Sequence, residues 1–136
     1  MTKAKAAVLA IAAAVVLSAA LMIVPGTAQA ASCSAFANKP QWDGAYVHGN
    51  GGVDCTAGQN SIYLHVCIQA YDRSDGWIDL GCNSGTNTTG KWGWSIWAAY
   101  GPGCYYRAYD YRTRTYAKTD LGTYRAYSAI LGIPCY

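Results

Sequence analysis

The chain has 136 residues, 52% of them hydrophobic and 13% aromatic, and a formal net charge of +3 at pH 7. Its 10 Lys and Arg stand against 7 Asp, without any Glu, and two of the lysines, Lys3 and Lys5, lie in an N-terminal leader. The remainder is close to neutral, so the basic balance of the whole chain says little about nucleic-acid or membrane partners. The length beyond the leader predicts one small domain.

The N-terminus has the features of a secretory signal peptide. After the two lysines, residues 6–24 form an apolar run that Pro25-Gly26 interrupts, and Ala28-Gln29-Ala30 supplies small residues for cleavage. We therefore expect residues 1–30 to be removed and residues 31–136 to be secreted. A retained membrane anchor is the alternative, since the apolar run is nearly long enough to span a bilayer.

The cysteines of the predicted mature domain indicate disulfides. None stands in the CxxC arrangement of a zinc ribbon or a thioredoxin-like redox pair. An even number in a short exported chain is typical of a disulfide framework formed in an oxidising compartment. We therefore expect an extracellular domain with its 6 cysteines in disulfides: Cys33, Cys55, Cys67, Cys82, Cys104 and Cys135.

The mature sequence predicts an all-β domain. Short runs rich in Tyr, Trp, Val, Ile and Thr are separated by Gly, Asn and Asp, and no segment has helical periodicity. Short strands with turn residues between them favour a single immunoglobulin-like β-sandwich of about seven strands. The expected strands are residues 33–37, 45–55, 61–71, 77–82, 91–100, 104–112 and 123–135.

Hairpin geometry favours one pairing of the cysteines. In an antiparallel hairpin, the residue numbers of each directly opposed pair add up to the same sum. The sequence position midway between two bonded cysteines should therefore fall in the turn. The midpoints of the local pairs fall at Gly44, between Ser74 and Asp75, and between Thr119 and Asp120, all in predicted turns. Each such bridge should stabilise the fold by about 3 kcal/mol. The three expected disulfides are Cys33–Cys55, Cys67–Cys82 and Cys104–Cys135.

Residues 61–71 alternate between aliphatic side chains on one face and polar or aromatic side chains on the other. The aliphatic face is expected in the core, so Cys67 points outward and its disulfide lies on the outer surface of a sheet. The same register would place Asp79 opposite Ala70 on the core side. A buried, unpaired carboxylate is costly, which suggests a β-bulge between these two strands.

The last hairpin completes a candidate binding face. If Cys104 lies opposite Cys135, Tyr106 and Ala108 face the core and their odd-numbered neighbours face outward. The third and sixth strands of an immunoglobulin-like sandwich are neighbours, and Tyr and Arg are residue types that anchor interfaces. The alternative is an ordinary sheet surface covered by tyrosines. The predicted face contains Tyr63, His65, Tyr71, Tyr105, Arg107, Tyr109 and Tyr111.

A tryptophan-rich run, residues 91–97, predicts a further strand. Trp92 and Trp94 share one face of it, and we expect both to fill the core. Trp97 lies on the opposite face and is the better candidate for exposure. An exposed tryptophan can stack on a sugar ring, which makes Trp97 a candidate glycan-binding residue.

Residues for catalysis are few. His48 and His65 are the only histidines, and no serine occupies a GxSxG nucleophile elbow. The carboxylates are all aspartates, several of them in turn segments, so a paired glycosidase site is not indicated. No ligand spacing supports a metal site. We therefore expect neither enzymatic activity nor a metal or cofactor.

Short segments along the whole mature chain resemble known proteins: the Cys33-Ser34-Ala35 opening, Lys39-Pro40, the Gly-rich turn before Asp54-Cys55, and the Tyr-Arg-Ala-Tyr segments. Together with the leader, they resemble small secreted actinobacterial β-domains that are rich in disulfides and mostly of unknown function. Some of these are similar to adaptor subunits of secreted streptomycete toxin particles, in which a small β-domain joins a lectin to a toxin chain. The resemblance assigns no catalytic residue.

The expected function is therefore that of a secreted, non-catalytic protein-interaction module: an adaptor, an inhibitor or a toxin-complex subunit. Its partner would be another secreted protein or a cell-surface component, without nucleic acid and without stable membrane insertion once the leader is removed. The alternative is a glycan- or cell-wall-binding module that uses Trp97 and exposed tyrosines.

Overall fold

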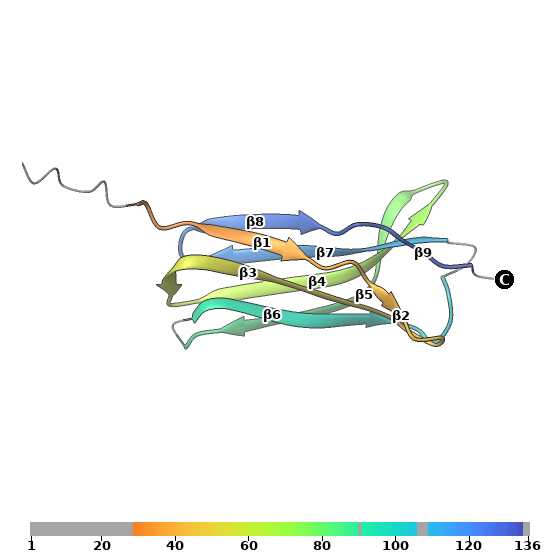
Figure 1. Cartoon of the computed structure of the whole chain (residues 1–136), viewed down its shortest axis with the longest axis horizontal. Helices are drawn as coiled ribbons and strands as arrows, with labels where there is room; N and C mark the ends of the chain where they lie inside the picture. The colour runs from red at the N-terminus through yellow and green to blue at the C-terminus, as the bar shows by residue number, and fades with distance from the viewer. Residues whose placement is uncertain (1–28, 90, 106–108, 135–136) are drawn as a thin grey trace, which may run out of the picture.

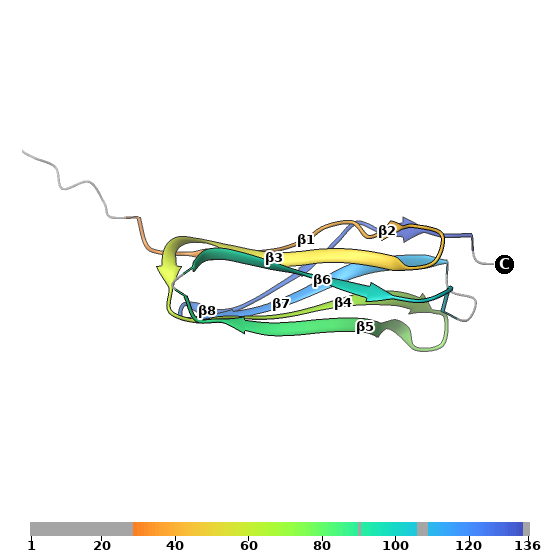
Figure 2. The ribbon, with the colours of Figure 1, turned by 90° about the horizontal axis from the view of Figure 1, so that it is seen from below.

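Strands make up all the regular secondary structure of the described residues. The computed structural model describes residues 29–89, 91–105 and 109–134. Within these ranges nine strands form two sheets that pack face to face (Figures 1 and 2). The predicted all-β sandwich is thus confirmed. In the same ranges no helix is long and apolar enough to cross a membrane.

The first sheet is built around one long central strand, β3 (Val47–Gln59). The short strands β1 (Cys33–Ala37) and β2 (Gln41–Trp42) pair with successive parts of one edge of β3. On its other edge β3 pairs with β6 (Lys91–Tyr100), whose bounds are those predicted. All these pairings are antiparallel.

The second sheet has the order β5-β4-β7-β8. The strand β4 (Ile62–Asp72) lies between β5 (Gly76–Asn87) and β7 (Asp110–Thr119). On its edge away from β4, β7 pairs with β8 (Gly122–Tyr127) and, further along, with β9 (Leu131–Gly132). Figure 2 shows β3 and β6 in one layer and β4 and β5 in the other.

The core lies between the sheets, and β4 supplies its centre as predicted. Burying these aliphatic groups removes apolar surface from water, at roughly 25 cal/mol per Å². Two buried clusters form, one around Val47 and Tyr111 and one around Val53 and Ala117. The aliphatic residues of β4 are all buried: Ile62, Leu64, Val66, Ile68 and Ala70.

Glycines on the inner face of β3 allow the two sheets to approach closely. Gly49 and Gly51 are buried, and a Cβ at either position would collide with the side chains of Thr113 and Thr115 of β7. The Gly-rich run of β3 therefore provides the space that these threonines occupy.

The last strands differ from the prediction. The sequence predicts residues 104–112 and 123–135, whereas the structure has β7, β8 and β9 with a turn between Thr119 and Gly122. This register pairs Tyr127 with Arg114, where the predicted one would pair it with Arg112. Arginine is very rarely buried unless it is paired, so the even-numbered residues of β7 face solvent and the odd-numbered ones, starting with Tyr111, face the core.

Two of the predicted disulfides are confirmed. Cys33 bonds to Cys55 and Cys67 bonds to Cys82, and in each case the two residues lie directly opposite each other in neighbouring strands. No described cysteine is free. Cys135 lies outside the described residues, so the third pair stays a prediction.

The bulge suggested by Asp79 is also confirmed. The register of β4 and β5 shifts between Cys67 and Gln69, which places Asp79 opposite Gln69 and Ile78 opposite Ala70. The shift keeps the carboxylate on the outer face of the sheet and the aliphatic side chain on the inner one, because only the latter can be buried without a polar partner.

The prediction for Trp92 is wrong. Trp94 is half-buried against the second core cluster, as expected, but Trp92 is 63% exposed. Trp92 stands at the start of β6, where the facing strand β3 has already shifted register between Asp54 and Gln59. The regular alternation between inner and outer face is therefore interrupted at Trp92, because its own strand is irregularly paired with β3 there.

Candidate functional site

The outer face of the second sheet collects aromatic and cationic side chains from all four of its long strands. Alternation along β4 points its polar and aromatic residues to this side, and the even-numbered residues of β7 join them. We call this surface the Tyr/Arg face. It comprises Tyr63, His65, Gln69 and Tyr71 of β4, Trp77 and Asp79 of β5, Arg112, Arg114, Tyr116 and Lys118 of β7, and Arg125 and Tyr127 of β8.

Arg112 of β7 lies between two aromatic rings of the Tyr/Arg face, opposite Gln69 of β4. Its guanidinium carbon is 4.1 Å from the ring centroid of Trp77 and 4.3 Å from that of Tyr127. These are distances at which a cation is attracted to a ring face. Arg112 Nε donates a hydrogen bond of 2.8 Å to Gln69 Oε1. Partial burial lowers the pKa of Arg112 from its usual value, but a guanidinium remains charged.

A polar chain links Arg112 to Arg114. Gln69 Nε2 donates to Asp79 Oδ1 at 2.7 Å, and Asp79 Oδ2 is paired with Arg114 Nη2 at 2.7 Å. The β-bulge makes this chain possible, because it brings Asp79 to the outer face opposite Gln69. Both arginines are therefore held in place before any partner arrives, which reduces the entropy lost on binding.

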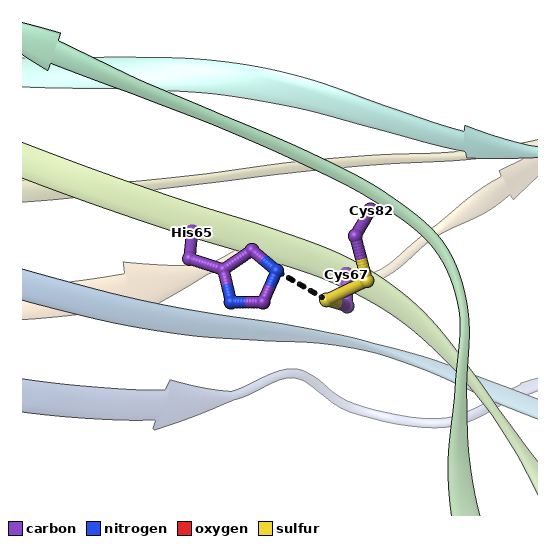
Figure 3. A group of neighbouring side chains, drawn as sticks. All are labelled: His65, Cys67 and Cys82. Carbon is purple, nitrogen blue, oxygen red and sulfur yellow. Dashed lines mark hydrogen bonds between the residues drawn. A yellow bond between two sulfur atoms is a disulfide. The ribbon is translucent and has the colours of Figure 1, made fainter.

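The Cys67–Cys82 disulfide lies in the same face, beside His65. Figure 3 shows the imidazole of His65 turned toward the sulfur of Cys67, and His65 Nε2 is 3.4 Å from Cys67 Sγ. The ligand atoms of His65, Cys67 and Cys82 lie within 4.8 Å of one another, at metal-site spacing. Metal binding requires thiolates, however, and both sulfurs are bonded to each other.

Next to the disulfide, the Tyr/Arg face forms an aromatic end with an open pocket of about 470 Å³. The rings of Tyr63 and Tyr116 meet edge to face with centroids 6.3 Å apart, and the guanidinium of Arg125 lies 5.7 Å from the Tyr116 ring. The pocket offers ring faces together with hydroxyl, ammonium and carboxylate groups. It is lined by Ser61, Tyr63, Thr86, Tyr116, Lys118, Thr119 and Asp120.

The middle of the Tyr/Arg face carries more positive than negative charge. Asp79 is its carboxylate and is paired with Arg114. The remaining cations are Arg112, Lys118 and Arg125. Asp110 and Asp120, both exposed, lie at the two ends of β7. The part of the chain beyond the leader, which is almost neutral overall, therefore presents a cationic and aromatic centre on one face.

The structure places the β4 half of the predicted face as expected. Tyr63, His65 and Tyr71 all lie on the outer side of β4. The ring of Tyr71 packs against that of Trp77, with ring centroids 5.4 Å apart. Neighbouring strands bring further residues to this face that were not predicted from the sequence: Trp77, Arg112, Arg114, Tyr116, Arg125 and Tyr127.

The other half of the predicted face needs correction. Tyr111 is fully buried, so its placement on the exposed face is wrong. Tyr105 precedes β7 and packs, half-buried, against the first core cluster. Tyr109 is exposed, as predicted, but it lies just before β7 begins. Arg107, Tyr106 and Ala108 lie outside the described residues.

Trp97 is 60% exposed, as predicted, but it lies on the outer face of the first sheet. It is paired with Asn50 of β3, and its backbone oxygen accepts a hydrogen bond of 2.8 Å from Asn83 Nδ2. Since Trp97 belongs to the other sheet, the structure does not bring it together with Tyr63 or Tyr71 on one surface.

The second histidine stabilises a turn. His48 Nε2 lies 2.7 Å from Asp43 Oδ2, while Asp43 Oδ1 accepts hydrogen bonds from the backbone N–H groups of Tyr46 at 2.7 Å and Ala45 at 2.8 Å. These bonds, led by that from Tyr46, lower the pKa of Asp43 to about 2. An aspartate that accepts backbone N–H groups in this way is an Asx turn, so the contacts of the pair have a structural explanation.

Replacing Arg112 with alanine should lower the free energy of unfolding by about 2 kcal/mol, since it removes two cation–π contacts and one charged hydrogen bond. Lysine should restore less than half of this, because it lacks the planar fork and stacks poorly. Urea unfolding measures both. Arg73→Ala, in the exposed β4–β5 turn, is the control and should change stability by less than about 0.5 kcal/mol. Equal effects at the two positions would show that the stacking contributes nothing.

No protein-family model and no curated protein matches this sequence. A functional assignment therefore depends on the chemistry of the surface. The Tyr/Arg face combines three properties: preorganised arginines, aromatic rings in edge-to-face contact, and a pocket at one end.

Proposed function

We propose that this protein is a secreted, non-catalytic protein-interaction module that binds its partner through the Tyr/Arg face. The observation that carries the proposal is the clamping of Arg112 between Trp77 and Tyr127 on the outer face of a sheet. Trp, Tyr and Arg are the residues in which interface binding energy concentrates. A rigid sheet that holds them in fixed rotamers loses little entropy when a partner docks.

The charge of the face selects the kind of partner. Arg112, Lys118 and Arg125 add to a centre in which Asp79 is already neutralised by Arg114. Complementary charge steers association and excludes cationic surfaces. We therefore propose a partner with an acidic surface, either another secreted protein or a cell-surface protein, with this chain as adaptor, inhibitor or toxin-complex subunit.

The finer features of the fold belong to the same proposal. We propose that the sandwich is immunoglobulin-like, with β1, β3 and β6 as strands A, B and E and with β4, β7 and β8 as strands C, F and G. The orders β1-β3 with β6 and β4-β7-β8 support this. We also propose that residues 1–30 are a cleaved signal peptide, that Cys104 bonds to Cys135, and that the fold shares its ancestry with small secreted actinobacterial β-domains.

Charge reversal on the Tyr/Arg face tests the proposal. Arg125→Glu should weaken capture of a secreted partner by roughly 30-fold or more, the scale of an anchor residue worth about 2 kcal/mol. Lys39→Glu makes the same charge change at an exposed position of the β1–β2 connection and should leave capture nearly unchanged. The measurement is pull-down from culture supernatant with immobilised residues 31–136, followed by titration of the captured protein. Equal losses for the two variants, or none for either, would contradict a binding face.

A glycan- or cell-wall-binding module is the second candidate, because two tryptophans of β6, Trp92 and Trp97, are 63% and 60% exposed. A glycan would stack on these rings, far from the cationic centre. Sedimentation with purified cell wall, beside the pull-down of a secreted partner, separates the candidates. If the protein binds glycan, Trp97→Ala should abolish its sedimentation with cell wall. If it binds a protein, Trp97→Ala should leave capture of the partner intact. Arg125→Glu should have the opposite pattern.

A further inference from the structure

The two sulfurs of the Cys67–Cys82 disulfide have different surroundings. Cys67 is completely buried, whereas Cys82, opposite it in β5, is exposed. The bond lies on the outer face of the second sheet, so an incoming group can reach one sulfur from solvent. Cys33–Cys55 differs in this respect, because both of its cysteines are half-buried and packed against the second core cluster.

Two hydrogen-bond donors reach the buried sulfur. His65 Nε2 lies 3.4 Å and Arg114 Nη2 lies 3.5 Å from Cys67 Sγ. A disulfide sulfur has no hydrogen and can only accept, so Arg114 Nη2 donates to it, and His65 donates to it in the tautomer that carries the proton on Nε2. Within the described part of the chain, no side chain makes such a bond to Cys82 Sγ. The polarisation of the bond therefore has a direction: negative charge is favoured on Cys67.

Arg114 can stabilise that charge further. Its Nε is buried and lacks a hydrogen-bond partner among the described residues, so the guanidinium retains donor capacity beside Cys67. Asp79 takes up part of the positive charge through its 2.7 Å contact with Nη2. A nearby guanidinium lowers the pKa of a cysteine thiol, and a sulfur whose thiol has a lower pKa leaves faster in exchange.

We propose that Cys82 is a site of covalent modification by small thiols through thiol–disulfide exchange. A thiol first gives its proton to solvent, and the resulting thiolate attacks Cys82 Sγ. A new S–S bond forms between the two, the Cys67–Cys82 bond breaks, and its electron pair leaves on Cys67 as a thiolate held by Arg114 and His65. The attacking sulfur is oxidised and Cys67 is reduced, so the step needs no other reagent.

The fold should survive this opening. Hydrogen bonding between β4 and β5 continues on both sides of the bridge, from Ile62–Asn87 to Asp72–Gly76. The group added at Cys82 would stand on the edge strand β5 of the Tyr/Arg face, separated from Arg114 of β7 only by Cys67 of β4. The inference does not depend on the proposed function, since exchange can be measured without any partner.

Reduced glutathione is a suitable probe for residues 31–136 carrying their disulfides. The reaction is quenched with acid at successive times, the free thiols are alkylated after unfolding, and peptides are mapped by mass spectrometry. We expect glutathione on Cys82 and alkylation on Cys67, appearing at least about tenfold faster than any opening of Cys33–Cys55. Glutathione mainly on Cys67, or equal rates for the two disulfides, would overturn the proposal.

A matched pair of variants tests the role of the cation. Arg114→Gln should slow exchange at Cys82 by about fivefold or more, whereas Arg73→Gln, in the exposed turn of the same hairpin, should not. Equal rates in the two variants would overturn the assignment of Arg114. If Arg114→Gln fails to fold, the distribution of glutathione between Cys82 and Cys67 in the natural sequence decides the proposal without it.

Discussion

Replacing Tyr111 with alanine should lower the free energy of unfolding by about 4 kcal/mol, the usual cost of removing a large aromatic side chain from a core. Tyr111 is the largest fully buried side chain of the described residues and belongs to the first core cluster. Its hydroxyl oxygen also accepts a hydrogen bond of 2.9 Å from the backbone N–H of Tyr105, and burial raises the pKa of this hydroxyl. Urea unfolding, monitored by tryptophan fluorescence, measures the change.

Two further variants separate packing from hydrogen bonding at this position. Tyr111→Phe keeps the ring and should cost only about 1 kcal/mol, the net value of a typical hydrogen bond. Tyr109→Ala removes an equally large side chain, but Tyr109 is 54% exposed, so its loss should change stability by less than about 0.5 kcal/mol. A loss at Tyr109 as large as that at Tyr111 would contradict the placement of Tyr111 in the core.

The assignment of Tyr111 shows where prediction from the sequence failed. Pairing Cys104 with Cys135 fixed the register of the last hairpin, and every side chain from Tyr105 to Tyr111 followed from it. The sequence contains a better signal: from Tyr111 to Lys118 the basic residues occupy only even positions. A strand that places Arg112, Arg114 and Lys118 on one side can bury only the other side.

The elements that could be predicted share local determinants. The aliphatic alternation of β4 is complete within eleven residues, and β4, β5 and their disulfide surround a single turn. Even the bulge could be anticipated, because burying Asp79 without a partner would be costly. Local pattern and local pairing thus determined this hairpin without reference to the rest of the chain.

The candidate site could be predicted only in part, because its contacts join distant strands. Tyr63, His65 and Tyr71 follow from the alternation of β4 alone. The clamp around Arg112 requires Trp77 from β5 and Tyr127 from β8, which meet only because β7 pairs with β4 in one particular register. No periodicity of the sequence encodes that pairing, since it joins strands of one sheet that are far apart along the chain.

The second large loss of stability is expected where β5 of the second sheet lies against β6 of the first sheet. Gly81 of β5 lies so close to β6 that a Cβ there would collide with the backbone carbonyl of Ala99 and stand 3.0 Å from the backbone nitrogen of Tyr100. Backbone atoms cannot rotate out of the way as a side chain can. A hydrogen bond of 2.8 Å from Asn83 Nδ2 to the backbone oxygen of Trp97 also joins β5 to β6.

Gly81→Val should therefore lower the free energy of unfolding by about 3 kcal/mol, at the upper end of what overpacking usually costs, because β5 and β6 must separate to admit the side chain. Gly132→Val, at an exposed position of β9 where a Cβ meets nothing within 4 Å, should cost less than about 1 kcal/mol. Both are measured by urea unfolding of residues 31–136. Exchange of the Asn83 side-chain amide protons, followed by NMR, should rise in the first variant only, because separation of the strands breaks the bond from Asn83 Nδ2 to the Trp97 oxygen. A Gly81→Val protein as stable as Gly132→Val would mean that β5 and β6 are not in contact.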